Sequence, residues 1–579
     1  MLRLEASSTD LHPAKMGAPL WRSEGLLAGC LFLMAAILYS AGLMETGFEG
    51  QDERRYAVVA KEIGPGAGEG SVRGGGLASY FVMTHMGELY PDKPPLFFWA
   101  QRLSYAVWGG VSPWAARFPL FLAAMGALIF VYLALRQAEG AAVALAGTGL
   151  LMLAGRFVWA SHWARLDIPM CFFVFGALWC SMRLLFPREG QDPGVRWAVL
   201  AWVFAGLAIL AKGPGGPLWM ILVALFAAVR RDWGVVRVHR PLLGVPIMLA
   251  IPALWFVPAA LLGGEDYIGP MIGTHVVERA VGIVRHGEPW YYFFERIAYD
   301  SAPLGLCLPA ALWFAWWRRR NGAAGDGDRA RESFWLVWLI GGLILFSLPQ
   351  GKRTLYILPL YPALAALVGR FFIAAAQSGA PLFLARLARA HLAAFAFVGV
   401  ALGVALLLGL RPEPSDHYPA PMGEGLALVL AWTASLGGAV VFAALWQRRT
   451  VLPFASLVVC VWLLEVLAFT FYFPPQRDDA VLREVAEVTD AQGGERLLVL
   501  GRENVFGLYG SLPCVVAPDD VIGAAAEVIA AHPGSPLVTY QGNFKSYSEF
   551  HFSVPEWTLI ASWRDPVANE TILLFDPHR

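Results

Sequence analysis

Long apolar stretches recur along most of the chain, and most charged residues lie between them. About thirteen of these stretches are long enough to cross a bilayer, which takes roughly 20 residues. They lie near Gly25–Leu43, Pro113–Leu135, Ala141–Ala160, Ile168–Phe186, Trp197–Ala211, Pro217–Val229, Leu242–Leu262, Ala302–Trp317, Phe334–Leu348, Leu355–Ile373, Ala393–Leu410, Leu426–Leu445 and Val451–Phe473. The pattern predicts a mainly α fold, a polytopic membrane helical bundle that occupies residues 1–473.

After residue 473 the pattern changes to shorter elements. These are helical patterns at Asp478–Ala491 and Asp519–Ala531, and short apolar runs at Arg496–Leu500, Pro536–Tyr540, Trp557–Ser562 and Thr571–Phe575. Helices that alternate with short apolar runs are typical of an α/β fold. We therefore expect residues 474–579 to form a small C-terminal α/β domain.

The composition fits a membrane protein and excludes several other classes. Hydrophobic residues make up 57% of the chain and charged residues 15%, whereas about a quarter of a soluble globular chain is charged. The 44 basic and 44 acidic side chains balance, which excludes a nucleic-acid binder with a basic face. Six cysteines spread over 579 residues are too few for a disulfide scaffold.

The loops between the apolar stretches alternate in character. One set is short and rich in arginine, as at Arg230, Arg231 and Arg318–Arg320, and the positive-inside rule places it in the cytoplasm. The other set contains the long loops Glu45–Ser112 and Gly263–Ser301 and therefore faces outward. With an odd number of spans, we expect a cytoplasmic N-terminus and a C-terminal domain on the outer face.

Polar residues gather in the outward-facing loops. The clusters contain Asp52, Glu53, Arg55 and Tyr56; Asp92 and Lys93; Arg165 and Asp167; Lys212; His275 and Arg279; and Lys352 and Arg353. Each has a structural explanation when taken alone, because an aspartate can cap a helix and a lysine can reach the interface from within the membrane. Together, cations beside acids at one membrane surface favour a site for an anionic lipid headgroup. Aromatic side chains that could contact its rings or tails are Trp99, Trp290, Tyr291 and Tyr292.

Five short motifs, in order along the membrane portion, resemble the GT-C glycosyltransferases that use polyprenyl-phosphate sugars. The nearest subgroup is the bacterial dolichyl-phosphate-mannose-protein mannosyltransferase-like and aminoarabinose transferase (ArnT-type) family. The motifs are Asp52–Ala57, which resembles D-E-x-R-Y-A; Gly87–Leu96, which resembles N-G-x-x-Y-x-[ED]-K-P-P-L without its Asn; Leu166–Pro169, which resembles L-D-x-P; Ala211–Pro214, which resembles T-K-G-P; and the late-span signature in Phe346–Leu364. Met86 stands where the family usually has Asn before Gly87.

The resemblance implies a multi-pass enzyme of the bacterial inner membrane, a hexosyl- or pentosyltransferase that takes its sugar from an undecaprenyl-phosphate donor at the periplasmic face. The ArnT-type subgroup points to 4-amino-4-deoxy-L-arabinose as the sugar and lipid A as the acceptor. The alternative is a related GT-C enzyme that glycosylates a protein or another envelope glycan. A lipid or sugar transporter is more remote, since polar residues would then lie near the bilayer midplane. A structural or sensory membrane protein would leave the ordered motifs unexplained.

The resemblance also implies roles for individual residues. Asp52 and Asp167 are expected to be catalytic, and Asp52 would act as the base toward a hydroxyl acceptor. The residues expected to bind the donor and its phosphate are Arg55, Tyr56, Lys93, Lys212, Arg279, Lys352 and Arg353. Asp92 and His275 are expected to bind a divalent metal, zinc or another. Expected partners are the lipid-linked donor, lipid A or another envelope acceptor, and membrane lipids.

Overall fold

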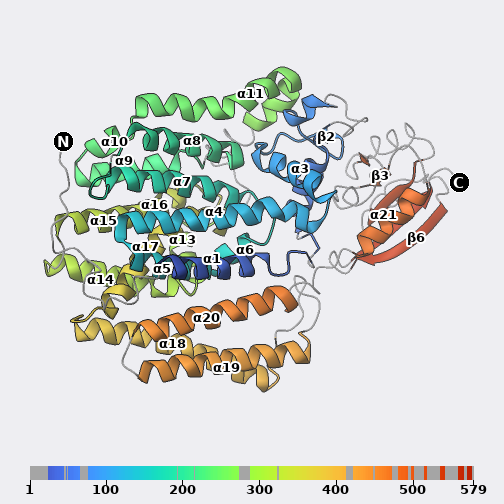
Figure 1. Cartoon of the computed structure of the whole chain (residues 1–579). Coiled ribbons are helices and arrows are strands. Elements are labelled where there is room, and N and C mark those ends of the chain that lie inside the picture. Colours follow the sequence, from blue (N-terminus) through green and yellow to red (C-terminus); the bar gives the residue numbers. More distant parts are fainter. Residues whose placement is uncertain are drawn as a thin grey trace.

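The computed structural model describes residues 24–44, 47–48, 50–64, 76–191, 193–213, 215–272, 287–322, 325–411, 422–446, 450–472, 480–492, 497–500, 514–517, 535–540, 558–565 and 570–576. In this part of the chain the helices form a bundle whose long members run side by side, and a small sheet lies at one end of it (Figure 1). The predicted mainly α membrane bundle is therefore confirmed.

Among the described residues, nine helical segments are long and apolar enough to cross a membrane. They are α4 (Pro113–Glu139), α7 (Asp167–Leu185), α8 (Val195–Lys212), α11 (Pro241–Ile272), α15 (Asp326–Leu336) with α16 (Gly342–Ser347), η7 (Thr354–Leu360) with α17 (Tyr361–Ala376), α18 (Leu382–Leu407), α19 (Glu424–Trp446), and α20 (Val451–Leu467) with η8 (Ala468–Tyr472). A tenth candidate is a pair bent by 115°, formed by α13 (Tyr292–Asp300) and α14 (Leu308–Arg320) with η5 (Gly305–Cys307) between them.

Shorter apolar helices coincide with the remaining expected stretches. These are α1 (Glu24–Ser40), α5 (Ala141–Met152) and α9 (Leu218–Arg230). Each apolar stretch that the sequence pattern predicts to be helical therefore falls on a helix or on two adjoining helices. Among the residues that the structure describes, nine or ten helical segments are long and apolar enough to span a membrane, compared with the expected number of about thirteen.

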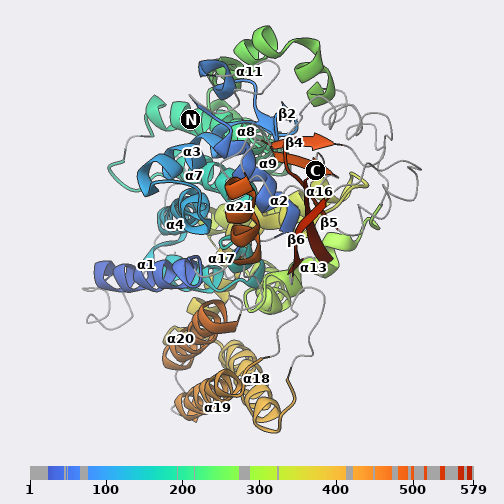
Figure 2. The ribbon, with the colours of Figure 1, turned by 90° about the vertical axis from the view of Figure 1, so that its right-hand side faces the viewer.

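The centre of the bundle is the segment formed by η7 and α17. Of its most apolar window 94% is buried, against 11% for the segment that contains α20. Close packing here depends on small residues: a Cβ at Gly147 of α5 would collide with the carbonyl of Ala365 on α17. Such contacts between small residues let helix backbones approach one another inside a membrane. Figure 2 shows α11 and the group α18–α20 on opposite sides of this centre.

The first outward loop is folded. It contains α2 (Gly50–Lys61), η3 (Leu77–Tyr80), a hairpin of β1 (Thr84–His85) and β2 (Glu88–Leu89), and α3 (Leu96–Trp108). The helical pattern into Ile63 predicted α2, whereas nothing in our sequence reading predicted α3. This loop brings two of the family-like motifs to the end of the bundle that lies nearest the C-terminal sheet (Figure 1).

The region predicted to be the long loop Gly263–Ser301 differs from the expectation in two respects. We expected loop from Gly263, but α11 continues to Ile272 past a kink at Gly264, whose φ is 66°. Glycine adopts this left-handed conformation without steric penalty. The segment after the gap at 273–286 forms α13, an amphipathic helix that the apolar pattern did not reveal.

The C-terminal region forms a five-stranded sheet with the order β4-β3-β5-β7-β6. Its elements are α21 (Ala480–Gln492), β3 (Leu497–Leu500), β4 (Cys514–Ala517), β5 (Leu537–Tyr540), β6 (Thr558–Asp565) and β7 (Glu570–Asp576). β3 pairs in parallel with β4 and β5, and β7 pairs antiparallel with β5 and β6. Four of the strands were predicted and β4 was not. The expected helix Asp519–Ala531 and the expected boundary at 473–474 lie outside the described residues.

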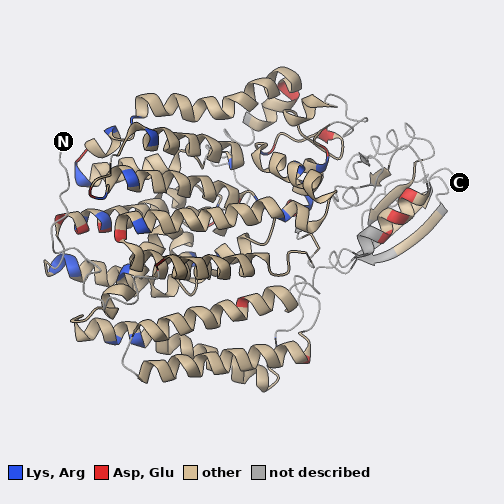
Figure 3. Cartoon of the chain, viewed as in Figure 1, with Lys and Arg blue, Asp and Glu red and all other residues tan. Residues whose placement is uncertain are grey.

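Many lysines and arginines lie at the end of the bundle farthest from the sheet (Figure 3). There Arg370 of α17, with 2% of its side chain exposed, bonds to Asp328 of α15 at 2.6 Å and also pairs with Glu139 of α4. Arg318 of α14 pairs with the same Asp328. The network ties four helices together at this end, where buried charges are stable only if they are paired.

Candidate functional site

Four side chains from α2, from the start of α7 and the residues before it, and from the end of α8 form a row of alternating charge, which we call the charge row. Asp52 Oδ2 accepts a bond from Arg165 Nη2 at 2.9 Å, and Arg165 Nε lies 3.8 Å from Asp167 Oδ2. Asp167 Oδ1 in turn pairs with Lys212 Nζ. The row connects α2 to α7 and α8.

The fold explains why two of these residues meet. Asp167 is the first residue of α7 and Lys212 the last residue of α8, and the two consecutive helices pack side by side. The start of one therefore lies beside the end of the other. Leu166 occupies the N-cap position of α7, so the capping explanation for Asp167 is wrong. Asp167 is 3% exposed, and a carboxylate buried to this degree needs the partners that it has here.

The late-span signature reaches the same place through η7. Lys212 Nζ lies 5.2 Å from the centroid of the Tyr356 ring, within the range of a cation–π contact. Lys352 Nζ donates to the carbonyl oxygen of Glu288 at 2.8 Å, which links the segment before η7 to the segment before α13. Arg353 is exposed at the N-cap position of η7.

Glu53, the neighbour of Asp52, has a structural role. Its carboxylate accepts bonds of 2.8 Å from Nε and Nη2 of Arg117 on α4, and one of 2.7 Å from the backbone N–H of Ala164. Both members of this ion pair are fully buried. Glu53 therefore joins α2 to α4 and to the turn that carries Arg165.

Tyr56 and Tyr90 belong to two different motifs of the first outward loop and pack against the same aromatic ring. Their rings lie 5.5 Å and 6.2 Å from the ring of Phe98 on α3, and the ring of His85 lies 6.0 Å from that of Tyr90. Burial, with the nearby Asp52 carboxylate adding to it, raises the pKa of Tyr56 well above its usual range. Burial also lowers the pKa of His85 to about 4, and the charge of Arg55 adds to this shift. Tyr56 and His85 are therefore neutral near pH 7.

The hairpin that precedes Lys93 is held by a half-buried acid. Thr84 Oγ1 donates to Glu62 Oε2 at 2.6 Å and the N–H of Gly87 donates to it at 3.3 Å, while burial raises the pKa of Glu62. At the turn, Met86 has a φ of 55°. Asn tolerates this left-handed conformation better than Met does, so the departure from the family motif falls on a strained position.

Lys93 and Asp92 follow this hairpin. Lys93 Nζ donates to the carbonyl oxygen of Asp92 at 3.2 Å, and both residues are half-buried. Among the described residues, no three His, Cys, Asp or Glu side chains gather closely enough to hold a metal ion. His275 and Arg279 lie outside the described residues. The metal site at Asp92 and His275 therefore stays a prediction.

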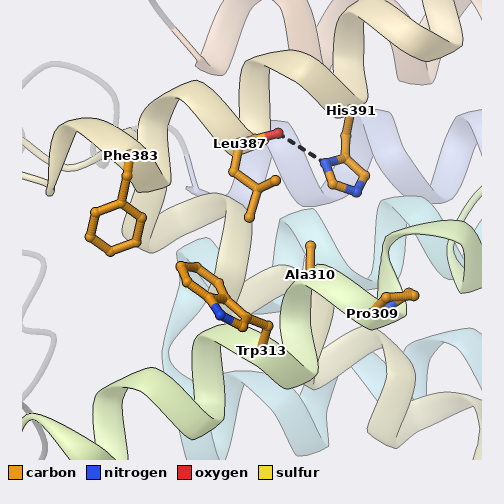
Figure 4. A pocket seen from close by; sticks show the side chains of 6 residues that line it. All are labelled: Pro309, Ala310, Trp313, Phe383, Leu387 and His391. Atoms are coloured by element: carbon orange, nitrogen blue, oxygen red, sulfur yellow. Dashed lines mark hydrogen bonds between the residues drawn. The ribbon is translucent and has the colours of Figure 1, made fainter.

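A separate hollow of about 490 Å³ lies between α14 and α18 (Figure 4). Its lining consists of Pro309, Ala310, Trp313, Phe383, Leu387 and His391. His391 Nδ1 lies 2.9 Å from the carbonyl oxygen of Leu387 on its own helix. None of the expected site residues lines this hollow.

The structure thus brings Asp52, Asp167 and Lys212 together, as the motifs predicted. Sequence reasoning assigned no role to Arg165, although the residue stands in the quoted cluster and bridges the two aspartates. It also assigned none to Arg117. The available signal was an arginine in the first turns of a long apolar helix, where a charge is costly unless it is paired.

The chain is also similar to known proteins in sequence. The family model described as dolichyl-phosphate-mannose-protein mannosyltransferase matches residues 92–256. An undecaprenyl phosphate-alpha-4-amino-4-deoxy-L-arabinose arabinosyl transferase of Pseudomonas fluorescens is 29% identical over 423 residues, which cover 70% of this chain and 69% of that protein. A transferase of Pseudomonas aeruginosa with the same name is 28% identical, with 70% of each chain covered.

The fold has a solved counterpart. The crystal structure of ArnT from Cupriavidus metallidurans bound to undecaprenyl phosphate superimposes with a TM-score of 0.72 at 20% identity, and covers 96% of this chain and 98% of that one. Given this coverage, the similarity extends over the C-terminal region as well as the bundle. Family model, sequence relatives and fold together support an integral membrane glycosyltransferase that is similar to the ArnT-type GT-C enzymes.

Proposed function

We propose that this enzyme transfers 4-amino-4-deoxy-L-arabinose from an undecaprenyl-phosphate donor to lipid A at the periplasmic face of the bacterial inner membrane. The names of its relatives supply the donor and the sugar. The observation that carries the proposal is the charge row, which collects residues of three separate motifs, Asp52, Asp167 and Lys212, at one end of the bundle.

The reaction breaks the bond between the anomeric carbon of the sugar and the phosphate oxygen, and an acceptor oxygen forms the new bond to that carbon. The leaving group is a phosphate, so charge neutralisation aids its departure more than a strong acid would. Lys212 is placed for this role because its ammonium already lies in the row, and we assign Lys93 and Lys352 to the same phosphate. One direct displacement inverts the configuration at the anomeric carbon.

Asp52 can serve two kinds of acceptor. A hydroxyl acceptor needs a base to remove its proton, and Asp52, whose side chain is 30% exposed, is accessible for this. A lipid A phosphate is already anionic and needs orientation, which Arg165 can provide while Asp52 holds its guanidinium. No step here passes through a metal ion; if Asp92 and His275 hold one, it would help to neutralise the leaving phosphate.

Mass spectrometry of lipid A tests the proposal. A strain without its own transferase receives the wild-type protein or Asp52→Asn, with Glu265→Gln as the control because Glu265 is an exposed acid of α11 outside the charge row. We expect a pentosamine on the lipid A phosphate with wild type and control, and a loss of at least a hundredfold with Asp52→Asn. Unmodified lipid A with the wild-type protein, together with a sugar on a protein or another glycan, would contradict lipid A as the acceptor.

A further inference from the structure

A second polar cluster adjoins the charge row. Arg156 lies on α6 (Gly155–Ala160), and its Nη2 donates to Oδ1 of Asp300, the last residue of α13, at 2.8 Å. The Asp300 side chain is 1% exposed and that of Arg156 is 27% exposed. One member of the pair is thus buried in the bundle while the other is partly exposed.

The bonding within this cluster is incomplete. Asp300 Oδ2, Arg156 Nε and the hydroxyl of Tyr361 are all buried, and none has a hydrogen-bond partner among the described residues. Tyr361 lies within electrostatic range of both Asp300 and Arg156. Buried ion pairs are normally stabilised by hydrogen bonds to their remaining polar atoms. Three unpartnered atoms in one place therefore indicate a polar ligand.

The cluster is continuous with the charge row. The indole of Trp159 lies between them, with its centroid 5.4 Å from the Arg156 guanidinium and 5.9 Å from that of Arg165. In addition, Cys171 of α7 lies within electrostatic range of both Tyr361 and Asp167. A ligand seated here would reach toward the reacting atoms at Asp52 and Asp167.

The chemistry of the cluster selects the kind of ligand. A phosphate or an ammonium group would have to break the Arg156–Asp300 pair, whereas a neutral hydroxyl can bond to Asp300 Oδ2 or Arg156 Nε while the pair stays intact. A hydroxylated ring suits the cluster better, because a carboxylate oxygen accepts hydroxyl protons while a guanidinium N–H and a phenol donate. The face of an indole packs against the apolar C–H face of such a ring.

We propose that Arg156, Trp159, Asp300 and Tyr361 form a subsite for an uncharged, hydroxylated portion of a sugar ring. The proposal rests on the proposed function, since it assigns part of a glycosyl donor or acceptor to this subsite. The ring is either the sugar on the undecaprenyl-phosphate donor or a sugar of the lipid A acceptor. These two sources share the same chemistry, and a binding experiment separates them.

The test measures dissociation constants of the full-length protein in nanodiscs for undecaprenyl phosphate, for undecaprenyl phosphate carrying 4-amino-4-deoxy-L-arabinose, and for lipid A. The variants are Trp159→Leu and Asp300→Asn. Trp313→Leu in the separate hollow between α14 and α18 is the matched control (Figure 4). We expect affinity for undecaprenyl phosphate to stay constant in both variants, while affinity for one sugar-bearing lipid falls about tenfold.

Each outcome decides the proposal. A fall confined to the sugar-loaded donor assigns the donor ring, and a fall confined to lipid A assigns the acceptor ring. Unchanged affinities in both variants would overturn the subsite. So would an equal fall for undecaprenyl phosphate, because the cluster would then act on the fold rather than on a ring. Transfer to lipid A by the wild-type protein is measured separately, so the proposed function can fail while the binding result still stands.

Discussion

Asp52 and Glu53 are adjacent in sequence and have opposite surroundings. Asp52 is partly exposed beside Arg165, whereas Glu53 is buried and takes two bonds from Arg117. The sequence predicted that acids at this position matter, but it could not separate the two, because the distinction depends on which face of α2 meets α4. Likewise, the bridging position of Arg165 follows from the approach of α2 to the start of α7, which no local pattern encodes.

Replacement of Glu53 by Gln should destabilise the fold. Arg117 would then be buried without a counter-charge, which costs about 3 to 5 kcal/mol. Thermal unfolding of the purified protein in detergent measures the effect. Asp52→Asn is the matched comparison, and we expect it to unfold near the wild-type temperature while its turnover is lost. An unchanged unfolding temperature for Glu53→Gln would show that the buried pair contributes little.

At the scale of elements, the sequence predicted the long apolar helices better than the shorter, more polar helices and strands. Long apolar runs give an unmistakable signal, so each expected stretch coincides with a helix. The surface helices α3 and α13 carry aromatic and charged residues together and lack such a run. The four residues of β4 are too few for periodicity to stand out. These elements acquire their structure from the surfaces on which they pack.

The free energy of unfolding should depend on pH because His85, in the hairpin of β1 and β2, has a lowered pKa in the folded protein. The folded pKa of about 4 lies below the ordinary value of 6.5, so the unfolded chain takes up a proton first as the pH falls. The stabilisation is fully present above pH 6.5 and is lost as the pH falls toward 4. Unfolding temperatures across this window should decline less steeply in His85→Asn than in wild type. Parallel declines would exclude His85 as the source.

In the whole molecule, the buried ion-pair network around Arg370 and the charge row lie at different ends of the bundle. The network of Arg370, Asp328 and Glu139 lies at one end of the bundle, and the charge row lies toward the end that carries the C-terminal sheet (Figures 1 and 3). The alternation of arginine-rich and long loops predicted such an arrangement. It could not predict that α17 lies at the centre, because that position depends on contacts between helices distant in sequence, such as α5 and α17.

Reporter fusions test the predicted orientation in the membrane. Alkaline phosphatase, which is active only outside the cytoplasm, should be active when it is fused after Arg579 and inactive when it is fused after Arg231. The reason is that the arginine-rich loops are held on the cytoplasmic side. A reporter with the opposite location preference provides the control at both positions. Activity after Arg231 would reverse the assignment and place the charge row on the cytoplasmic face.

The charge row has a further consequence for how a ligand enters. The charges of its two aspartates and its two cationic side chains cancel, so an arriving phosphate meets no unpaired cation. It must replace Asp167 on Lys212, much as one counter-ion replaces another on an exchange resin, while Arg165 retains the displaced carboxylate. Binding of a phosphate thus exchanges one ion pair of Lys212 for another, and no pocket of uncompensated positive charge is filled. Its equilibrium should respond to added salt less than a bare cationic pocket would, because screening weakens the old and the new pairing together.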